Sequence, residues 1–112
     1  MDKLVVVWKS NIEADVHYFA LPYAYNSKLK GWFDEVEVLI WGASQEMFRD
    51  DPKVRKSVER LIKGGIKVVA CKMCADHIGA TELLEASGIE VIYTGVYLSD
   101  NQKDPEVQVI TI

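Results

Sequence analysis

Five short apolar runs, separated by segments of helical character, constrain the fold of this chain most strongly. The runs are rich in β-branched and aromatic residues and occupy residues 4–8, 36–41, 66–70, 89–93 and 107–112. The first run, residues 4–8, is continuously apolar, which is typical of a strand buried on both faces, as in a parallel sheet. The alternation of the five runs with helices predicts an α/β fold, a three-layer α/β/α sandwich with a five-stranded, mostly parallel sheet. The strand order and the direction of the last strand stay open.

Polar and small residues between the runs indicate where helices begin and end. Ser10-Asn11-Ile12-Glu13 is typical of a capping box, and Asp51-Pro52 is typical of a helix start. Pro22 predicts a kink or break in the first helix, because it lacks an N–H and crowds the preceding turn. Gly79 predicts the end of one short helix, and Thr81 predicts the cap of the next. A short helical turn is expected around residues 45–48, and a short helical or irregular segment through residue 102.

Composition limits the classes of protein to which the chain can belong. With 112 residues, 49% of them apolar, it is long enough for one domain, 1–112, whose core needs neither disulfides nor a metal. The net charge is −4 and the basic residues are scattered, unlike the pattern of a nucleic-acid or anionic-membrane binder. The first apolar run is too short for a signal peptide or a membrane span. We therefore expect a cytoplasmic protein with no nucleic-acid or membrane partner.

Four turns are expected at the carboxyl ends of the strands, where open α/β sheets bind ligands. They are Lys9-Ser10-Asn11, Gly42-Ala43-Ser44, Cys71-Lys72-Met73-Cys74 and Thr94-Gly95. Ser10, Asn11, Gly42, Ser44 and Gly95 are thus candidates for contacts at this edge, although residues of these types more often serve as caps and turns. Only the cysteine turn holds groups that no cap or turn requires.

Cys71 and Cys74, the two cysteines of the chain, follow the third apolar run directly. A strand that delivers a thiol to the first turn of a helix places sulfur among unpaired N–H groups, which favour the thiolate, and Lys72 favours it further. The turn could be a redox dithiol, a metal site with His77 in C-x-x-C-x-x-H spacing, a sulfur carrier or a pair of structural thiols. A zinc site usually draws its ligands from two segments, so neither a metal nor another cofactor is expected.

The two histidines differ in their expected roles. His77 follows Cys74 by one helical turn, so it could hydrogen-bond or protonate a nearby sulfur. His17 lies near Glu13 and is expected to be a solvated helical residue. No Ser-His-Asp order, phosphate-binding loop or paired carboxylates indicate a hydrolase or a nucleotide enzyme.

Two stretches of the sequence resemble the DsrE/DsrF-like family of small, YchN-like α/β proteins of the sulfur-relay type. They are residues 67–79, KVVACKMCADHIG, and residues 88–95, GIEVIYTG. The resemblance extends to Trp41-Gly42 and to the chain length, so it covers essentially the whole domain. It implies a compact α/β/α domain with a mostly parallel sheet, commonly assembled into trimers or hexamers.

The resemblance also implies a role for one cysteine. In sulfur-relay members the acceptor cysteine follows the third strand and precedes a helix-ending glycine, as Cys71 and Gly79 do here. The chain departs from that pattern in two ways. Cys74 is not required by it, and Asp76 and His77 stand where basic residues often precede the glycine.

These observations together predict a sulfur carrier of the sulfurtransferase type, which holds a persulfide on Cys71 and relays it between a donor and an acceptor protein. The alternatives are a non-catalytic oligomeric binding module of the same fold and a Cys71/Cys74 dithiol oxidoreductase. Cys71 is expected to be the more reactive thiol, with Cys74 turned toward the core. A homo-oligomer is expected because several large apolar side chains lie outside or at the ends of the core stripes. They are Trp32, Phe33, Trp41, Met47, Phe48 and Tyr97.

Overall fold

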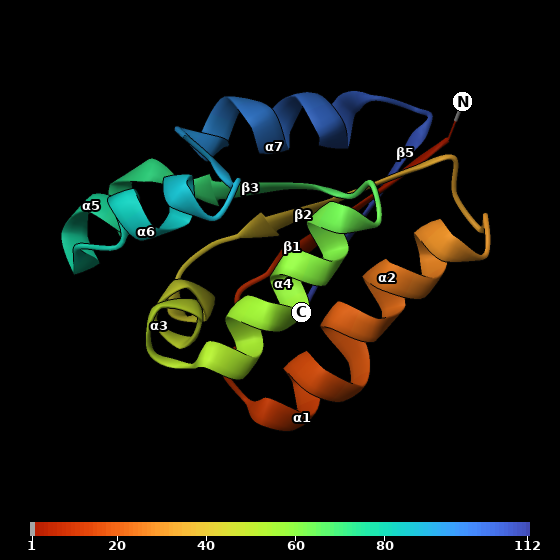
Figure 1. Ribbon diagram of the computed structural model, residues 1–112. Coiled ribbons are helices and arrows are strands. Elements are labelled where there is room, and N and C mark those ends of the chain that lie inside the picture. The colour runs from red at the N-terminus through yellow and green to blue at the C-terminus, as the bar shows by residue number, and fades with distance from the viewer. Residues whose placement is uncertain (1) are drawn as a thin grey trace.

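The computed structural model describes residues 2–112 and contains one five-stranded sheet (Figure 1). The strands are β1 (Lys3–Trp8), β2 (Glu35–Ile40), β3 (Lys67–Cys71), β4 (Glu90–Ile92) and β5 (Val107–Thr111). They lie in the order β4-β3-β2-β1-β5, and every pair of neighbours is parallel. The predicted fold is confirmed, and the last strand, whose direction the sequence leaves open, runs parallel to β1.

Helices connect the strands and cover both faces of the sheet. They are α1 (Glu13–Asp15), the π-helix η1 (Val16–Ala20), α2 (Leu21–Leu29), α3 (Ala43–Asp50), α4 (Pro52–Lys63), α5 (Lys72–Ile78), α6 (Thr81–Ala86) and α7 (Thr94–Lys103). Leu4 of β1 belongs to the larger core, which also holds residues of α2, α4 and α6, while Val5 belongs to a smaller core on the other face that includes Leu98 of α7. Figure 1 shows α7 on the side of the sheet opposite to α2 and α4.

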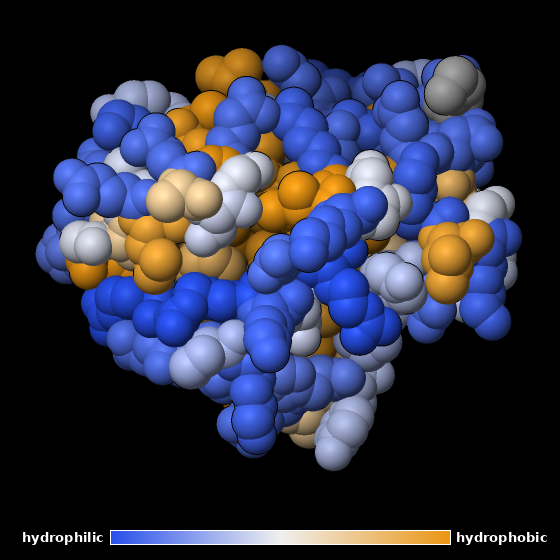
Figure 2. Space-filling view, viewed as in Figure 1, coloured by the Kyte–Doolittle hydropathy of each residue, from blue (hydrophilic) through white to orange (hydrophobic). Residues whose placement is uncertain are grey.

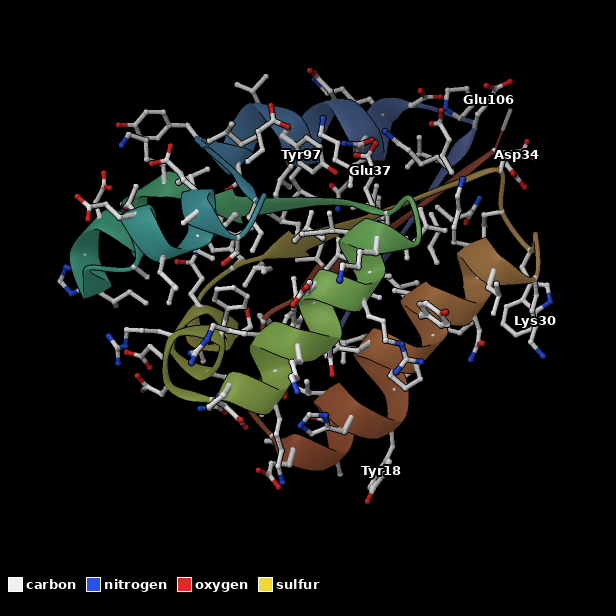
Figure 3. The ribbon with its side chains drawn as sticks, viewed as in Figure 1. Tyr18, Lys30, Asp34, Glu37, Tyr97 and Glu106 are labelled. Carbon is white, nitrogen blue, oxygen red and sulfur yellow. The ribbon has the colours of Figure 1, made fainter. Side chains whose placement is uncertain are left out.

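A polar contact ties α7 to the middle of the sheet. The hydroxyl of Tyr97 donates a short hydrogen bond to the carboxylate of Glu37 on β2 (Figure 3). Lys3 Nζ lies 3.4 Å from another oxygen of the same carboxylate. Tyr97 therefore links α7 to two strands of the sheet through one carboxylate.

The first helix passes through Pro22 without a break but changes to a π-helix just before it, so of the predicted kink or break the break does not occur. Pro22 lies in the first turn of α2, directly after the π-helix. There the N–H of Leu21 donates to the carbonyl of Val16, five residues earlier. In this wider turn the hydrogen bonds span five residues and not four, just before the proline. Pro22 has no N–H to donate, yet the helix continues past it.

The start of this helix also differs from the expected capping box. The N-cap residue is Ile12, which has no side-chain cap and is 61% exposed. The hydroxyl of Ser10 accepts a hydrogen bond from the N–H of Ile12 and donates one to Asp15. Ser10 therefore stabilises the turn before the helix, and the box predicted with Glu13 does not form.

Other helix boundaries follow the sequence in some places and not in others. Asp51 caps α4 by accepting the N–H of Lys53, and Gly79 ends α5 in the left-handed conformation, both as predicted. In contrast, α3 starts directly after Gly42 and is eight residues long, because Gly42 with φ 73° turns the chain straight out of β2. Thr81 lies inside α6 and donates to Asp76, while Ala80 takes the N-cap position.

The large apolar residues expected at the surface are mostly covered. Trp32 is 53% exposed, but Phe48 is fully buried in the larger core. The remaining four, Phe33, Trp41, Met47 and Tyr97, are partly buried. Figure 2 shows apolar surface as separate patches on a largely hydrophilic face, one of them over α5 and α6. Among residues 2–112, none of the helices has the length and apolar character needed to cross a bilayer.

Candidate functional site

Cys71 lies at the junction of β3 and α5 and is held there by its own backbone. It is the last residue of the strand and the N-cap of the helix, and it is 4% exposed. Gln45 of α3 is fully buried, and its Nε2 donates to the carbonyl of Cys71 at 3.0 Å and to that of Ile40 at 3.1 Å. One amide therefore joins the carboxyl ends of β2 and β3 and fixes the position of the cysteine.

The surroundings of Cys71 favour its ionised form. Burial acts to raise its pKa, yet the pKa of Cys71 lies below the ordinary cysteine value. The groups that lower it are the backbone N–H of Cys74, the hydroxyl of Thr94, the thiol of Cys74 and the backbone N–H of Met73. The start of α5 thus stabilises a thiolate at Cys71 despite the desolvation of the sulfur.

Cys74 has the opposite character. Its pKa is raised, first by burial and then by the neighbouring Cys71, although a backbone hydrogen bond from Gly42 acts in the other direction. Cys74 is also the more exposed of the two thiols, so the expectation that it points toward the core is wrong. It sits in the first turn of a helix whose buried contact is made by Ala75 instead.

Cys74 opens onto a groove between the start of α3 and the outer face of α5. The groove is lined by Gly42, Ala43, Glu46, Met73, Cys74, Asp76, His77 and Ile78. Gly42 therefore contributes to the site in two ways, because its backbone hydrogen-bonds Cys74 and the residue also lines the groove. His77 lines the same groove, but in the described part of the chain it makes no hydrogen bond to either sulfur.

The charged residues of α5 interact with each other and not with the sulfurs. Lys72 Nζ lies 3.0 Å from Asp76, whose hydrogen bond and charge raise the pKa of the lysine. Asp76 in turn accepts from Thr81, and hydrogen bonds from Thr81 and Lys72 lower its pKa. The expectation that Lys72 stabilises the thiolate therefore finds no support, because its ammonium is held on the outer face of the helix.

The remaining edge candidates divide into two groups. Gly95 lies in the first turn of α7, beside Thr94, and so belongs to the cysteine site. Ser44 is buried and its hydroxyl donates to the carbonyl of Trp8 at 2.6 Å, which ties β1 to the start of α3. Asn11 lines a separate hollow with Glu46 and Met47, and Ser10 serves the turn before α1. The structure thus keeps Ser10, Asn11 and Ser44 apart from the thiols.

Two residues that the sequence did not single out belong to the site. Gln45 holds the carbonyl of Cys71, and Thr94 acts on its sulfur. Gln45 gave no signal, because a glutamine near the start of a helix is usually solvated. Thr94 was named only as part of a turn, and its nearness to Cys71 depends on the pairing of Cys71 with Ile92.

Three exposed apolar side chains lie close to site residues in the sequence. Met73, Tyr93 and Val96 are 68%, 71% and 71% exposed. They flank Cys74 and Thr94 in the chain, and exposed apolar side chains gathered at one edge mark an interaction surface more often than scattered ones do. Within residues 2–112, no three His, Cys, Asp or Glu side chains are grouped so that they could hold a metal ion.

The sequence matches no family model and none of the curated proteins. Solved structures resemble it over its whole length. The conserved protein of unknown function BT1422 from Bacteroides thetaiotaomicron is 30% identical with a TM-score of 0.94, covering 99% of this chain and 95% of that one. The ychN protein from E. coli is 18% identical with a TM-score of 0.79, and MTH1491 from Methanobacterium thermoautotrophicum, a protein of unknown function, is 20% identical with a TM-score of 0.77. Each of these two matches covers 100% of this chain and 100% of the other chain.

The likeness to ychN and the likeness to BT1422 support different conclusions. The likeness to ychN concerns the fold alone, and at that level it supports the DsrE-like resemblance of the sequence. The identity to BT1422 extends over nearly the full length of both chains. We conclude that this chain belongs to the same family as the conserved protein BT1422 of Bacteroides thetaiotaomicron.

Proposed function

We propose that the protein carries sulfur as a persulfide on Cys71 and relays it between a donor and an acceptor protein. The observation that carries this proposal is that two thiols in one helical turn have pKa values shifted in opposite directions. The pKa of Cys71 is lowered although its sulfur is buried, while the pKa of Cys74 is raised. The turn therefore presents one nucleophilic sulfur and one that stays protonated beside it.

The transfer needs no oxidant or metal. The Cys71 thiolate attacks the outer sulfur of a donor persulfide, a new S–S bond forms at Cys71, and the donor leaves as its thiolate. In the second step an acceptor thiolate attacks the outer sulfur now on Cys71, and the Cys71 thiolate leaves. A low pKa at Cys71 favours both steps, because it supplies the thiolate in the first and a good leaving group in the second.

The raised pKa of Cys74 protects the bound sulfur. An ionised Cys74 would attack the inner sulfur of the Cys71 persulfide, expel hydrosulfide and leave a Cys71–Cys74 disulfide. A protonated Cys74 makes this attack slow. Its raised pKa therefore supports transfer to an external acceptor.

Access to Cys71 agrees with a protein donor. The cysteine is 4% exposed, but a persulfide adds an outer sulfur about 2 Å beyond it. Met73, Tyr93 and Val96 offer an exposed apolar surface next to it. Assembly of the carrier as a homo-oligomer, a trimer or a hexamer, belongs to the same proposal and rests on the family resemblance.

One observation favours a second function. A side-chain hydrogen bond from Cys74 lowers the pKa of Cys71, and this interaction between the two thiols supports a dithiol oxidoreductase that forms a Cys71–Cys74 disulfide. A non-catalytic binding module of the same fold is the third reading, and it requires no reaction at either thiol.

Intact mass after exposure to a loaded cysteine desulfurase separates the three. A carrier gains the mass of one sulfur in the wild type and in Cys74→Ser, and gains none in Cys71→Ser. An oxidoreductase instead loses two hydrogens and retains no sulfur, while a binding module keeps its mass. Either of the last two results would contradict the carrier proposal.

A further inference from the structure

Thr94 lies next to the cysteine turn, although Thr94 and Cys71 are distant in the sequence. The parallel pairing of β3 and β4 sets Cys71 opposite Ile92, and α7 begins two residues later, at Thr94. Figure 1 shows the start of α7 next to the end of β3. The register of the sheet thus brings the threonine to the cysteine turn.

The hydroxyl of Thr94 is buried and lacks a partner. Thr94 is 2% exposed, and within residues 2–112 its Oγ1 makes no hydrogen bond of normal geometry. The N-cap residue Tyr93 supplies no side-chain cap either, so the first N–H groups of α7 are uncapped at the same place. A buried hydroxyl without a partner is unfavourable, so its presence in a native structure calls for an explanation.

We propose that the Thr94 hydroxyl is the donor that stabilises the sulfur of Cys71 when that sulfur is anionic. A neutral thiol is a weak acceptor, whereas an ionised acceptor forms the stronger hydrogen bond, so the hydroxyl gains its partner when Cys71 loses its proton. The register of β3 with β4 brings Thr94 to the cysteine turn, and the lowering of the Cys71 pKa by Thr94 agrees with that placement. Ser27, another buried hydroxyl without a partner, lies on α2, outside the elements that form this site.

The position of the hydroxyl depends on α7 as a whole. Thr94 is the first residue of that helix, and three residues later Tyr97 anchors the helix to Glu37 on β2. Asn101 Nδ2 donates to the carbonyl of Tyr97 at 2.8 Å within the helix. Because α7 is fixed to the sheet one turn after Thr94, the threonine is held next to the cysteine turn before Cys71 ionises.

The pH dependence of alkylation at Cys71 tests this inference. Trypsin cleaves after Lys67, Lys72 and Lys103, so Cys71 falls on peptide 68–72 and Cys74 on peptide 73–103. Iodoacetamide labelling followed by digestion and mass spectrometry thus reports both thiols from one sample. In Thr94→Val the midpoint of the Cys71 profile moves to higher pH, and in Thr94→Ser, which keeps a hydroxyl, it returns toward the wild-type value.

The size of the effect follows from two opposing factors. At a pH below both midpoints, loss of a hydrogen bond to a charged group lowers the thiolate fraction roughly tenfold. The less acidic thiolate is intrinsically more nucleophilic, which returns about a factor of three. Alkylation of Cys71 in Thr94→Val is therefore about threefold slower than in the wild type at that pH.

Three controls keep the result specific. Thr81→Val removes the hydroxyl of another threonine in a first helical turn, which binds Asp76, and leaves the Cys71 midpoint unchanged. The Cys74 peptide reports folding, because unfolding would give both thiols the profile of free cysteine. Thr94→Ala, measured in parallel, removes the hydroxyl without adding the second methyl group that valine would bury there. It gives the same shift as Thr94→Val.

A Cys71 midpoint that stays in place in folded Thr94→Val or Thr94→Ala would overturn the inference. The inference deepens the proposed function, since it concerns the same sulfur, but its test uses no sulfur donor. A protein that shows the shift and never accepts sulfur would contradict the carrier proposal alone.

Discussion

The amide of Gln45 donates a hydrogen bond to the carbonyl of Cys71, with a distance of 3.0 Å between nitrogen and oxygen, and both residues are buried. The same nitrogen also bonds the carbonyl of Ile40, so one side chain of α3 closes the ends of two neighbouring strands. The two carbonyls belong to the last residues of β2 and β3. Gln45 therefore joins the ends of both strands at the point where the reactive cysteine begins its helix.

Substitution Gln45→Leu is expected to destabilise the protein. It retains side-chain volume but removes the donor that the carbonyls of Ile40 and Cys71 share, at a cost of about 1–3 kcal/mol. Urea denaturation measures the loss as a lower midpoint. Glu46→Leu, the same substitution at the exposed neighbouring position, serves as the matched control. Equal midpoints for the two variants would show that the buried hydrogen bonds contribute nothing.

Retention of the persulfide is expected to depend on pH through Cys74. The pKa of Cys74 is raised, so its thiol stays protonated up to a higher pH than the ordinary value of about 8.5 and attacks the Cys71 persulfide only in alkaline solution. Hydrosulfide release from the loaded protein should therefore rise steeply at alkaline pH. Cys74→Ser should lack this rise. Release that is already fast at neutral pH in the wild type would disprove the protective role of Cys74.

Substitution Tyr97→Phe is expected to lower stability at neutral pH by about 1–3 kcal/mol, because Glu37 loses its hydroxyl partner. Burial first, and then the hydrogen bond and charge of Glu37, raise the pKa of Tyr97. An acid with a raised pKa in the folded state stabilises the fold below its unfolded value of about 10, and this contribution is lost as pH rises above it.

Thermal denaturation between neutral and alkaline pH checks both parts of that prediction. The wild type should lose stability above about pH 10 more steeply than Tyr97→Phe. Tyr18→Phe is the matched control, because Tyr18 is 85% exposed and projects away from the sheet in Figure 3. A loss of stability in Tyr18→Phe equal to that in Tyr97→Phe would rule out a specific role for the contact with Glu37.

Two glycines at the site are expected to respond oppositely to alanine. Gly42 has φ 73° and ψ −133°, a conformation that other residues avoid, so Gly42→Ala should cost about 1–3 kcal/mol although its Cβ would meet no atom. Gly95 is helical and equally unobstructed, so Gly95→Ala should be neutral or stabilising by at most about 1 kcal/mol. Chemical denaturation of both variants provides the comparison. Equal stability would indicate that Gly42 is not strained.

Much of the fold could be predicted because its signals are local. Asp51-Pro52 and Gly79 specify helix ends through their own backbone and side-chain chemistry, and the structure places both as expected. The π-turn before Pro22 could not be predicted, because a proline indicates that the helix is disturbed but not which form the disturbance takes. Phe48 looked like a surface residue only because α3 was expected to be shorter than it is.

The site could be predicted less completely than the fold. The position of Cys71 follows from a strand that ends at a helix start, which is a local pattern. The roles of Gln45 and Thr94 depend on the strand order and on the register of Cys71 with Ile92, neither of which hydrophobic periodicity reports. The greater exposure of Cys74 depends on which side of α5 faces the core, and Ala75 takes that side.

Localisation of an added sulfur tests the central claim most directly. The protein is loaded with a persulfide-bearing cysteine desulfurase, alkylated without reduction and digested with trypsin. The account predicts one additional sulfur on peptide 68–72, which carries Cys71, and none on peptide 73–103, which carries Cys74. Additional sulfur on peptide 73–103, or on neither peptide, would contradict it.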